Sequence, residues 1–324
     1  MDTRPHVMFY EAFQEEAEEL RKHLPHDVPS EFTALTIQEH GASLPPADVI
    51  SIRTQSVIPE VWAGKVAGIL TRSTGHDHVA AYRAATGTGA ACGYLPLYCA
   101  RAVAEQAMLL WSALLRRLPT QVAQFRTFHR DGLTGREIEG RKLAVFGVGN
   151  IGREVVRIGE GLGMRVVGVD VVQRHPAVQY VLAEEAIQRA DVIVCAMNLT
   201  AENRGFFDLE RLKTARPGTI LVNIARGELC VPADLLRLIK EGRLGGIGMD
   251  VYNDEPELAV ALRTGEESPS PSARAVHALA QFPNVICTPH NAFNTVESVE
   301  RKCVQSVEQL QAFWAQGVFL WPVP

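Results

Sequence analysis

The run from Leu143 to Gly152, which reads Leu-Ala-Val-Phe-Gly-Val-Gly-Asn-Ile-Gly, constrains the fold more than any other part of the chain. Its apolar half is typical of a buried strand, and its glycines suit a tight turn that leads directly into a helix. Gly147 permits the turn, Gly149 lets the backbone approach a phosphate, and Gly152 lets the helix pack closely on the strand. Because the free N–H groups at the start of such a helix bind a pyrophosphate, we predict a dinucleotide-binding loop.

A second apolar run follows and ends at Asp170, 18 positions after Gly152. This spacing is near the offset of about 20 residues expected for a carboxylate that binds the ribose hydroxyls of a dinucleotide. A negative charge at this place repels the 2′-phosphate of NADP, so we predict NAD as the cofactor. Arg174 lies close by in the sequence and offers the alternative, a cation that holds that phosphate.

The length and charge of the chain set wider limits. Its 324 residues allow two domains, since single hydrophobic cores stop growing at about 250 to 300 residues. A net charge of −5 without a dense Lys/Arg tract argues against binding to nucleic acid or to an anionic membrane. The start of the chain, residues 1–6, lacks the pattern of a signal peptide, and no apolar stretch reaches the roughly 18 residues that span a bilayer. We expect a cytoplasmic protein whose partner is a small molecule.

The six cysteines are scattered, without a C-x-x-C pair, and several lie in apolar runs. This distribution indicates reduced core residues, and we predict no metal site.

Strands and helices are expected to alternate on both sides of the glycine loop, which favours two α/β units. Before the loop we expect strands at 7–10, 48–54 and 66–71, helices at 11–24 and 100–118, the latter ending at Pro119, and a loop at 125–139. After the loop we expect strands at 191–196, 218–224, 246–251 and 284–288. The stretch 257–280, which contains the Ser/Pro residues 268–272, is expected to be irregular. We also expect a helix at 295–314 and an apolar tail at 317–324 that packs on the first domain. The later strands form a parallel sheet whose carboxyl ends share one edge, where ligands of such sheets bind.

Three polar residues follow strands at that edge: Arg226, Glu255 and His290, called the trio below. Each alone has an ordinary interpretation, as a surface arginine, a loop acid or a hydrogen-bonded loop histidine. Together they match the needs of hydride transfer to a 2-oxo acid, which requires a cation for the carboxylate and an acid for the new alkoxide. Arg226 can bind a carboxylate with two parallel hydrogen bonds, His290 can donate and accept a proton near neutral pH, and Glu255 would fix the imidazole tautomer and favour its protonated form.

At this point the chain resembles a known family, the D-isomer-specific 2-hydroxyacid dehydrogenases. The resemblance is carried by the glycine loop and by the segments 223–227 (Asn-Ile-Ala-Arg-Gly), 250–256 (Asp-Val-Tyr-Asn-Asp-Glu-Pro) and 288–290 (Thr-Pro-His). It implies that Arg226, Glu255 and His290 are the catalytic residues. It also implies that the NAD site includes Gly147, Gly149, Asn150, Ile151, Gly152, Asp170, Met197, Asn198, Asn203 and Asp250, although the family usually has Pro at the position of Asn198.

The first domain is similar to the D-lactate dehydrogenase branch of the family. The segment 72–77 (Arg-Ser-Thr-Gly-His-Asp) resembles the loop whose backbone holds the substrate carboxylate, with Thr74 and Gly75 at the corresponding positions. The same branch implies substrate contacts from Tyr98 and Phe293. For these two aromatic residues, core packing is the competing interpretation.

The fold that the resemblance implies is α/β with two doubly wound domains. A Rossmann NAD-binding domain at 101–292 is inserted into a flavodoxin-like substrate domain made of 1–100 and 293–324. We expect an NAD-dependent oxidoreductase that interconverts a small 2-oxo acid and its D-2-hydroxy acid. Glyoxylate or hydroxypyruvate reduction is the runner-up, and a non-catalytic NAD-sensing protein similar to corepressors of this fold is a further alternative. The family also implies a homodimer, with the apolar helix Ala102–Leu115 as the expected interface.

Overall fold

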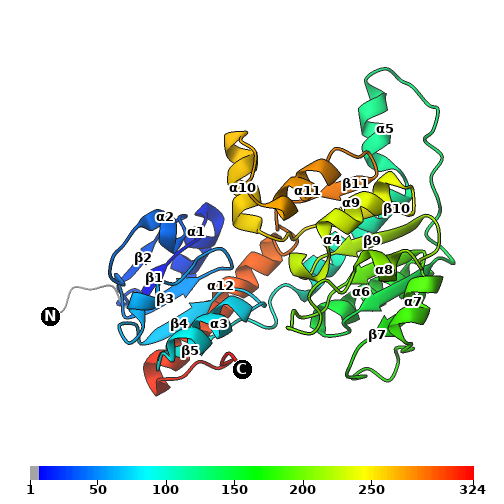
Figure 1. The fold of residues 1–324 in the computed structure, drawn as a ribbon. Helices are drawn as coiled ribbons and strands as arrows, with labels where there is room; N and C mark the ends of the chain where they lie inside the picture. Colours follow the sequence, from blue (N-terminus) through cyan, green and yellow to red (C-terminus); the bar gives the residue numbers. More distant parts are fainter. Residues whose placement is uncertain (1–6) are drawn as a thin grey trace. The chain divides into compact units, whose positions relative to one another are not determined.

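The structure is a computed structural model that describes residues 7–324 of the chain (Figure 1). The chain divides into two compact units, and each is described here by itself. Unit 1 comprises Met1–Cys99 and Asn294–Pro324, and unit 2 comprises Ala100–Phe293. The segment 1–6, on which the signal-peptide expectation rests, lies outside the described residues.

Unit 1 is built on a five-stranded parallel sheet with the strand order β2-β1-β3-β4-β5. This is the order of flavodoxin-like sheets, in which the chain reverses direction across the sheet after its first two strands. The strands are β1 (Val7–Phe9), β2 (Ser30–Phe32), β3 (Val49–Ile52), β4 (Gly68–Thr71) and β5 (Ala91–Gly93).

Helices cover both faces of this sheet, because alternate strand residues point to opposite sides and apolar residues lie on both of them. On one face, α2 (Ile37–His40) and α3 (Asp77–Thr86) pack on a cluster that includes Met8, Ile50 and Ile69. On the other face α12 (Val296–Gln316) packs against α1 (Gln14–His23) and β4. A short 3-10 helix, η1, spans Glu60–Trp62. The final residues return to the sheet, where the Val323 N–H donates to the Cys92 carbonyl at 2.8 Å.

Unit 2 contains a six-stranded parallel sheet with the order β11-β10-β9-β8-β6-β7. Its strands are β6 (Lys142–Phe146), β7 (Arg165–Val169), β8 (Val192–Cys195), β9 (Thr219–Asn223), β10 (Leu244–Met249) and β11 (Val285–Cys287). The direction of winding reverses between β6 and β8, so the glycine loop after β6 lies at the switch point where such sheets bind ligands. On the outer edge of β7 the segment around Tyr180 pairs with Gly168.

Two layers of helices enclose the sheet of unit 2 (Figure 1). The long helix α4 (Ala100–Leu115) packs against α6 (Asn150–Gly161), β9 and β10 on one face. The core of the other face is shared by α7 (Ala183–Arg189), α8 (Leu209–Leu212), α9 (Pro232–Lys240) and α11 (Pro271–Leu279), while η2 (Gly227–Leu229) and α10 (Glu255–Thr264) lie in the loops at the carboxyl edge.

Two expectations about local structure were wrong. The stretch 257–280, expected to be irregular, contains most of α10 and all of α11, and the Ser/Pro residues start α11 with Ser270 as N-cap and Pro271 in the first turn. Proline suits this position because the first N–H groups of a helix have no partner inside the helix. For the same reason Pro119 does not stop a helix: α4 ends at Leu115, and Pro119 lies in the first turn of α5 (Leu118–Phe125).

The apolar character of α4 is explained by packing within unit 2. Nine of its sixteen residues are buried, and Leu109 is its large exposed apolar residue. Exposed apolar side chains gather instead just beyond α4, at Val122, Phe125 and Phe128. The six cysteines are free, and all but the half-buried Cys287 are buried, as expected for reduced core residues. No described helix is both long enough and apolar enough to cross a bilayer.

Candidate active site

The glycine turn after β6 has the shape that the sequence predicts. Gly147 has φ = 85°, and a side chain on it would come within 2.7 Å of the Ala196 backbone. A Cβ on Gly152 would come within 1.9 Å of the Gly147 carbonyl oxygen. By contrast, the space beside Gly149 is open, since nothing lies within 4 Å of where its Cβ would be. Gly147 and Gly152 therefore build the turn, and Gly149 leaves room for a ligand.

Asp170 connects this turn to the end of β7. Its Oδ2 accepts a hydrogen bond from the Val148 N–H at 2.6 Å, and its Oδ1 accepts one from the Val172 N–H at 3.0 Å. The carboxylate thus fixes the glycine turn and remains half-buried at the carboxyl end of the strand. Asn150 and Ile151 form the first turn of α6, whose N-cap Gly149 has no side chain to satisfy the N–H groups there.

The segment after β8 lies against the same turn. The built Cβ of Gly147 comes within 2.7 Å of the Met197 Cα. Asn203 closes this segment, because its amide donates to the Asn198 carbonyl at 2.8 Å and its Oδ1 accepts from the Thr200 N–H at 2.8 Å. The open space at Gly149, the uncapped helix start and the carboxylate on β7 together fit a dinucleotide with free ribose hydroxyls.

Arg226 follows β9 and is held there by a residue that the sequence interpretation did not single out. Asn223, 1% exposed at the end of β9, donates to the Arg226 carbonyl at 2.8 Å and accepts from the Ala225 N–H at 3.1 Å. The guanidinium also donates to the Ala225 carbonyl at 2.8 Å. These bonds fix the turn that leads into η2 and present the arginine side chain at the carboxyl edge of the sheet.

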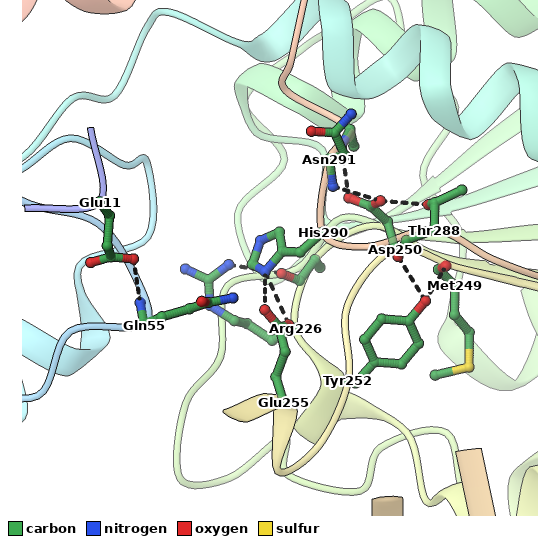
Figure 2. A network of polar contacts seen from close by, with 12 residues as sticks. Glu11, Gln55, Arg226, Met249, Asp250, Tyr252, Glu255, Thr288, His290 and Asn291 are labelled. Atoms are coloured by element: carbon green, nitrogen blue, oxygen red, sulfur yellow. Dashed lines mark hydrogen bonds and ion pairs between the residues drawn. The ribbon is translucent and has the colours of Figure 1, made fainter. Parts of the chain in front are cut away.

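Glu255 and His290 form a direct pair, and Figure 2 shows the Arg226 guanidinium beside them. The Nδ1 atom of His290 lies 2.9 and 3.0 Å from the two carboxylate oxygens of Glu255. Both side chains are partly exposed, at 25% and 18%. Because a carboxylate only accepts hydrogen bonds, this geometry places a proton on Nδ1 and leaves Nε2 for chemistry. The structure therefore brings the trio together.

The loop that carries His290 is held by Asp250, which is 1% exposed at the end of β10. Its Oδ1 accepts from the Thr288 hydroxyl at 2.5 Å and from the Asn291 N–H at 2.9 Å, and its Oδ2 accepts from the Ala292 N–H at 2.8 Å (Figure 2). Burial raises the pKa of Asp250, although these three donors oppose the rise. The carboxylate expected at the cofactor thus holds the His290 loop.

Tyr252 is a second support that the sequence interpretation did not single out. Its hydroxyl lies 2.7 Å from the Thr288 carbonyl and 3.0 Å from the Met249 carbonyl. Burial raises its pKa, so the hydroxyl keeps its proton and donates to this pair of carbonyls. Both Asn223 and Tyr252 belong to the segments that carry the family resemblance. A polar side chain at the end of a buried strand was the signal that could have identified Asn223, whereas Tyr252 lies three positions after the end of β10.

The expected substrate residues lie in both units. In unit 1, Thr74 donates to the Leu95 carbonyl at 3.1 Å, and Gly75 accepts from the Ser73 hydroxyl at 2.6 Å. Tyr98 is buried in unit 1, and burial raises its pKa well above the usual value. Phe293 is half-buried at the end of unit 2, directly after the loop that Asp250 holds.

Comparison with known proteins decides the family. The profile described as D-isomer specific 2-hydroxyacid dehydrogenase, NAD binding domain, matches residues 107–292, which is more than half of the chain. The chain belongs to this family. Among the relatives of this dehydrogenase, D-lactate dehydrogenase of Streptococcus agalactiae is 32% identical over 66% of the chain and 68% of the relative. Glycerate dehydrogenase of Methylorubrum extorquens is 32% identical over 55% of the chain and 52% of the relative.

A solved structure agrees with this assignment. The dehydrogenase superposes on D-lactate dehydrogenase from Aquifex aeolicus, crystallised with NAD and lactic acid, with a TM-score of 0.83 and 27% identity over 97% of this chain and 98% of the other. These findings confirm the predicted family, the fold of two parallel-sheet domains and NAD as the cofactor. They also confirm the reaction class, the NAD-dependent interconversion of a 2-oxo acid and a 2-hydroxy acid.

Proposed function

We propose that this dehydrogenase reduces a small 2-oxo acid to the D-2-hydroxy acid, with pyruvate-like substrates preferred. The observation that carries the proposal is the paired contact of His290 Nδ1 with both oxygens of Glu255, next to Arg226. Bound NADH supplies the hydride in this chemistry. The protein supplies the groups that bind the substrate and move the proton.

Each member of the trio has a distinct role. Arg226 binds the substrate carboxylate and orients the carbonyl, since a guanidinium matches a carboxylate with two parallel hydrogen bonds. His290 donates a proton from Nε2 to the carbonyl oxygen as that oxygen gains charge, and takes a proton back in the reverse direction. Glu255 holds the opposite ring nitrogen, so the imidazole keeps one orientation and one tautomer.

The substrate and cofactor contacts complete the proposal. Backbone N–H groups around Thr74 and Gly75 would hold the substrate carboxylate, and Tyr98 and Phe293 would shape the pocket for its side chain. The half-buried carboxylate of Asp170 supports a preference for NAD over NADP, because it opposes a phosphate on the ribose. The free, mostly buried cysteines suit a reducing compartment, which supports a cytoplasmic location.

We also infer that the enzyme is a homodimer. The support is the group of exposed apolar side chains on and after α5, Val122, Phe125 and Phe128, with Leu109 on α4. Apolar groups exposed together mark protein interfaces. A second copy of the chain would cover them.

A kinetic panel tests the function. NADH consumption is measured with pyruvate, phenylpyruvate, glyoxylate and hydroxypyruvate, for the wild type, for His290→Ala and for Arg226→Lys. We expect His290→Ala to lower kcat by about 10²- to 10⁴-fold, the usual contribution of a positioned general acid. The matched control is His26→Ala, because His26 is exposed in the turn between α1 and β2 of unit 1 and lies far along the chain from the trio. Unchanged turnover in His290→Ala removes this histidine from the mechanism.

The same panel separates the alternatives. The similarity to glycerate dehydrogenase keeps glyoxylate or hydroxypyruvate reduction as the second candidate, and a higher kcat/KM for these acids than for pyruvate would select it. Self-association that depends on NAD, without turnover of any oxo acid, would instead indicate a corepressor-like binding protein.

A further inference from the structure

The Ser/Pro stretch at 268–272 is a sequence motif that has no role in the reaction described above. It lies between α10, which begins with Glu255, and α11, which is anchored in the core of unit 2 through Ala273, Val276 and Leu279. The stretch therefore joins α10 to the anchored helix α11, and its side chains can fix one helix relative to the other.

Helix α10 is weakly attached to the rest of unit 2. Of its ten residues, Leu258 is the buried one. Between α10 and α11 lies a groove of about 540 Å³, lined by Leu258 and Leu262 on one side and by Ala273 and His277 on the other. Side-chain packing alone thus leaves space between the two helices, so another interaction must fix the orientation of α10.

The residue before Glu255 is held in a strained conformation. Asp254, the N-cap of α10, has φ = 50° and ψ = 44°, in the left-handed region. A residue with a Cβ pays free energy to adopt this conformation, and such a cost persists only where neighbouring contacts oppose relaxation. Because Asp254 directly precedes Glu255, its backbone angles set the direction in which the catalytic carboxylate leaves the chain.

Ser270 makes the contact that holds Asp254 in this conformation. Its hydroxyl donates to Asp254 Oδ2 at 2.5 Å, and the same oxygen accepts from the Ala273 N–H at 3.2 Å as the N-cap of α11. Its own N–H donates to the hydroxyl of Ser268, a residue that is 6% exposed, at 3.2 Å. A continuous set of hydrogen bonds therefore runs from the anchored start of α11 to the strained residue next to Glu255.

We propose that Ser270 is a positioning residue of the reaction, which holds Glu255 against His290 by fixing Asp254. The proposal rests on the proposed function of the trio. In Figure 2 the Glu255 carboxylate faces the His290 ring, and a small rotation at Asp254 would break one or both of the contacts at 2.9 and 3.0 Å. The imidazole would then lose the contact that fixes its orientation and its tautomer.

Variants of Ser270 and Asp254 test this. Ser270→Ala removes the donor, whereas Ser270→Thr keeps both the hydroxyl and the helix cap. Asp254→Ala removes the acceptor and keeps the Cβ, so the cost of the left-handed conformation remains while the contact that opposes its relaxation is lost. Ser272→Ala, two residues further in the same stretch, is the matched control.

The readouts are kcat and KM for oxo-acid reduction, together with the melting temperature. We expect Ser270→Ala and Asp254→Ala to lower kcat by about tenfold with little change in KM, because the imidazole loses its fixed orientation. Ser270→Thr and Ser272→Ala should keep the wild-type kcat.

Each outcome decides the matter. Wild-type kcat in both Ser270→Ala and Asp254→Ala would overturn the positioning role while leaving the proposed function intact. A loss of kcat in Ser270→Ala that Ser272→Ala matches, or that Asp254→Ala does not share, would also overturn it, because that is the result of a merely structural role in the cap of α11. A wild type without turnover of any oxo acid would refute the proposed function itself.

Discussion

Replacing Glu16 with Gln should sharply destabilise unit 1, because this buried carboxylate serves two cations. Its Oε1 lies 2.7 Å from Arg72 Nε and its Oε2 lies 2.8 Å from Lys302 Nζ. The three side chains are 5%, 0% and 1% exposed. Arg72 also donates to the Ser51 hydroxyl and to the Tyr10 carbonyl, so the cluster joins α1 and α12 to the sheet. Gln keeps the shape of Glu16 but removes its charge and replaces one of the two accepting oxygens with an NH₂ group, which cannot accept from Arg72 or Lys302.

The size of the expected loss in unfolding free energy follows from the charges around Glu16. Burial alone would raise the pKa of Glu16, but Arg72 and Lys302 outweigh it and lower the pKa from 4.5 to about 2. This difference corresponds to about 3 kcal/mol of interaction between the carboxylate and its surroundings. Removing one partner of a buried ion pair costs about 3 to 5 kcal/mol, because the remaining charge stays buried without compensation. We therefore expect Glu16→Gln to lower the free energy of unfolding of unit 1 by about 3 kcal/mol.

Urea unfolding followed by tryptophan fluorescence measures this loss, because Trp62, Trp314 and Trp321 all belong to unit 1. The matched variant is Glu16→Gln combined with Lys302→Met, which also removes one of the stranded cations. Burial lowers the pKa of Lys302 to about 8 in spite of Glu16, so this ammonium is already costly to keep charged. The double variant should be more stable than Glu16→Gln alone. A loss below about 1 kcal/mol in Glu16→Gln, the value typical of exposed pairs, would refute the reasoning.

Two further predictions concern Asp250 and the proposed dimer. Asp250→Asn places an amide NH₂ against the N–H of Ala292 or against the donors at Thr288 and Asn291. We expect kcat to fall by about 10- to 100-fold and the free energy of unfolding to fall by about 1 to 3 kcal/mol. An unchanged pH–rate profile and an unchanged stability would show that the His290 loop keeps its conformation without Asp250. Replacing both Phe125 and Phe128 with Ser should shift the protein from dimer to monomer in light scattering, and a wild type that is already monomeric contradicts the dimer.

The parts of the site that could be predicted are those that depend on strand order. Arg226, Glu255 and His290 each follow a strand of one parallel sheet, and the carboxyl ends of such strands meet at one edge. The glycine loop was predictable for the same reason, as a strand, a turn and a helix in direct succession. Neither inference needs knowledge of how side chains pack.

The parts that could not be predicted depend on long-range partners. Glu16 lies in the sequence Gln-Glu-Glu-Ala-Glu-Glu, which is typical of a solvated helix face, and its cations come from segments far along the chain. Helix α10 was missed because the Ser/Pro residues that follow it suggested a loop, although Leu258, Ala261 and Leu262 are spaced as on one face of a helix. The start of α11 was read as a loop, although Ser followed by Pro is also the pattern of an N-cap and first turn.

Asp250 shows why a sequence can identify an active-site edge without assigning roles on it. Asp170, Asn223 and Asp250 all occupy the end of a strand or the position after it, and each uses its side chain to hold backbone N–H or carbonyl groups of a neighbouring turn. In the sequence, these residues are polar and lie near the carboxyl ends of strands, as Arg226 and His290 do three positions after β9 and β11. Exposure separates the two sets: Asn223 and Asp250 are each 1% exposed, whereas His290 is 25% exposed. A buried polar group is stable only when protein groups satisfy it, so the buried members hold the turns and the exposed ones remain for the substrate. Asp170 lies between these limits, because it holds the glycine turn while half-buried, and this is the arrangement expected of a carboxylate that serves both the fold and the cofactor.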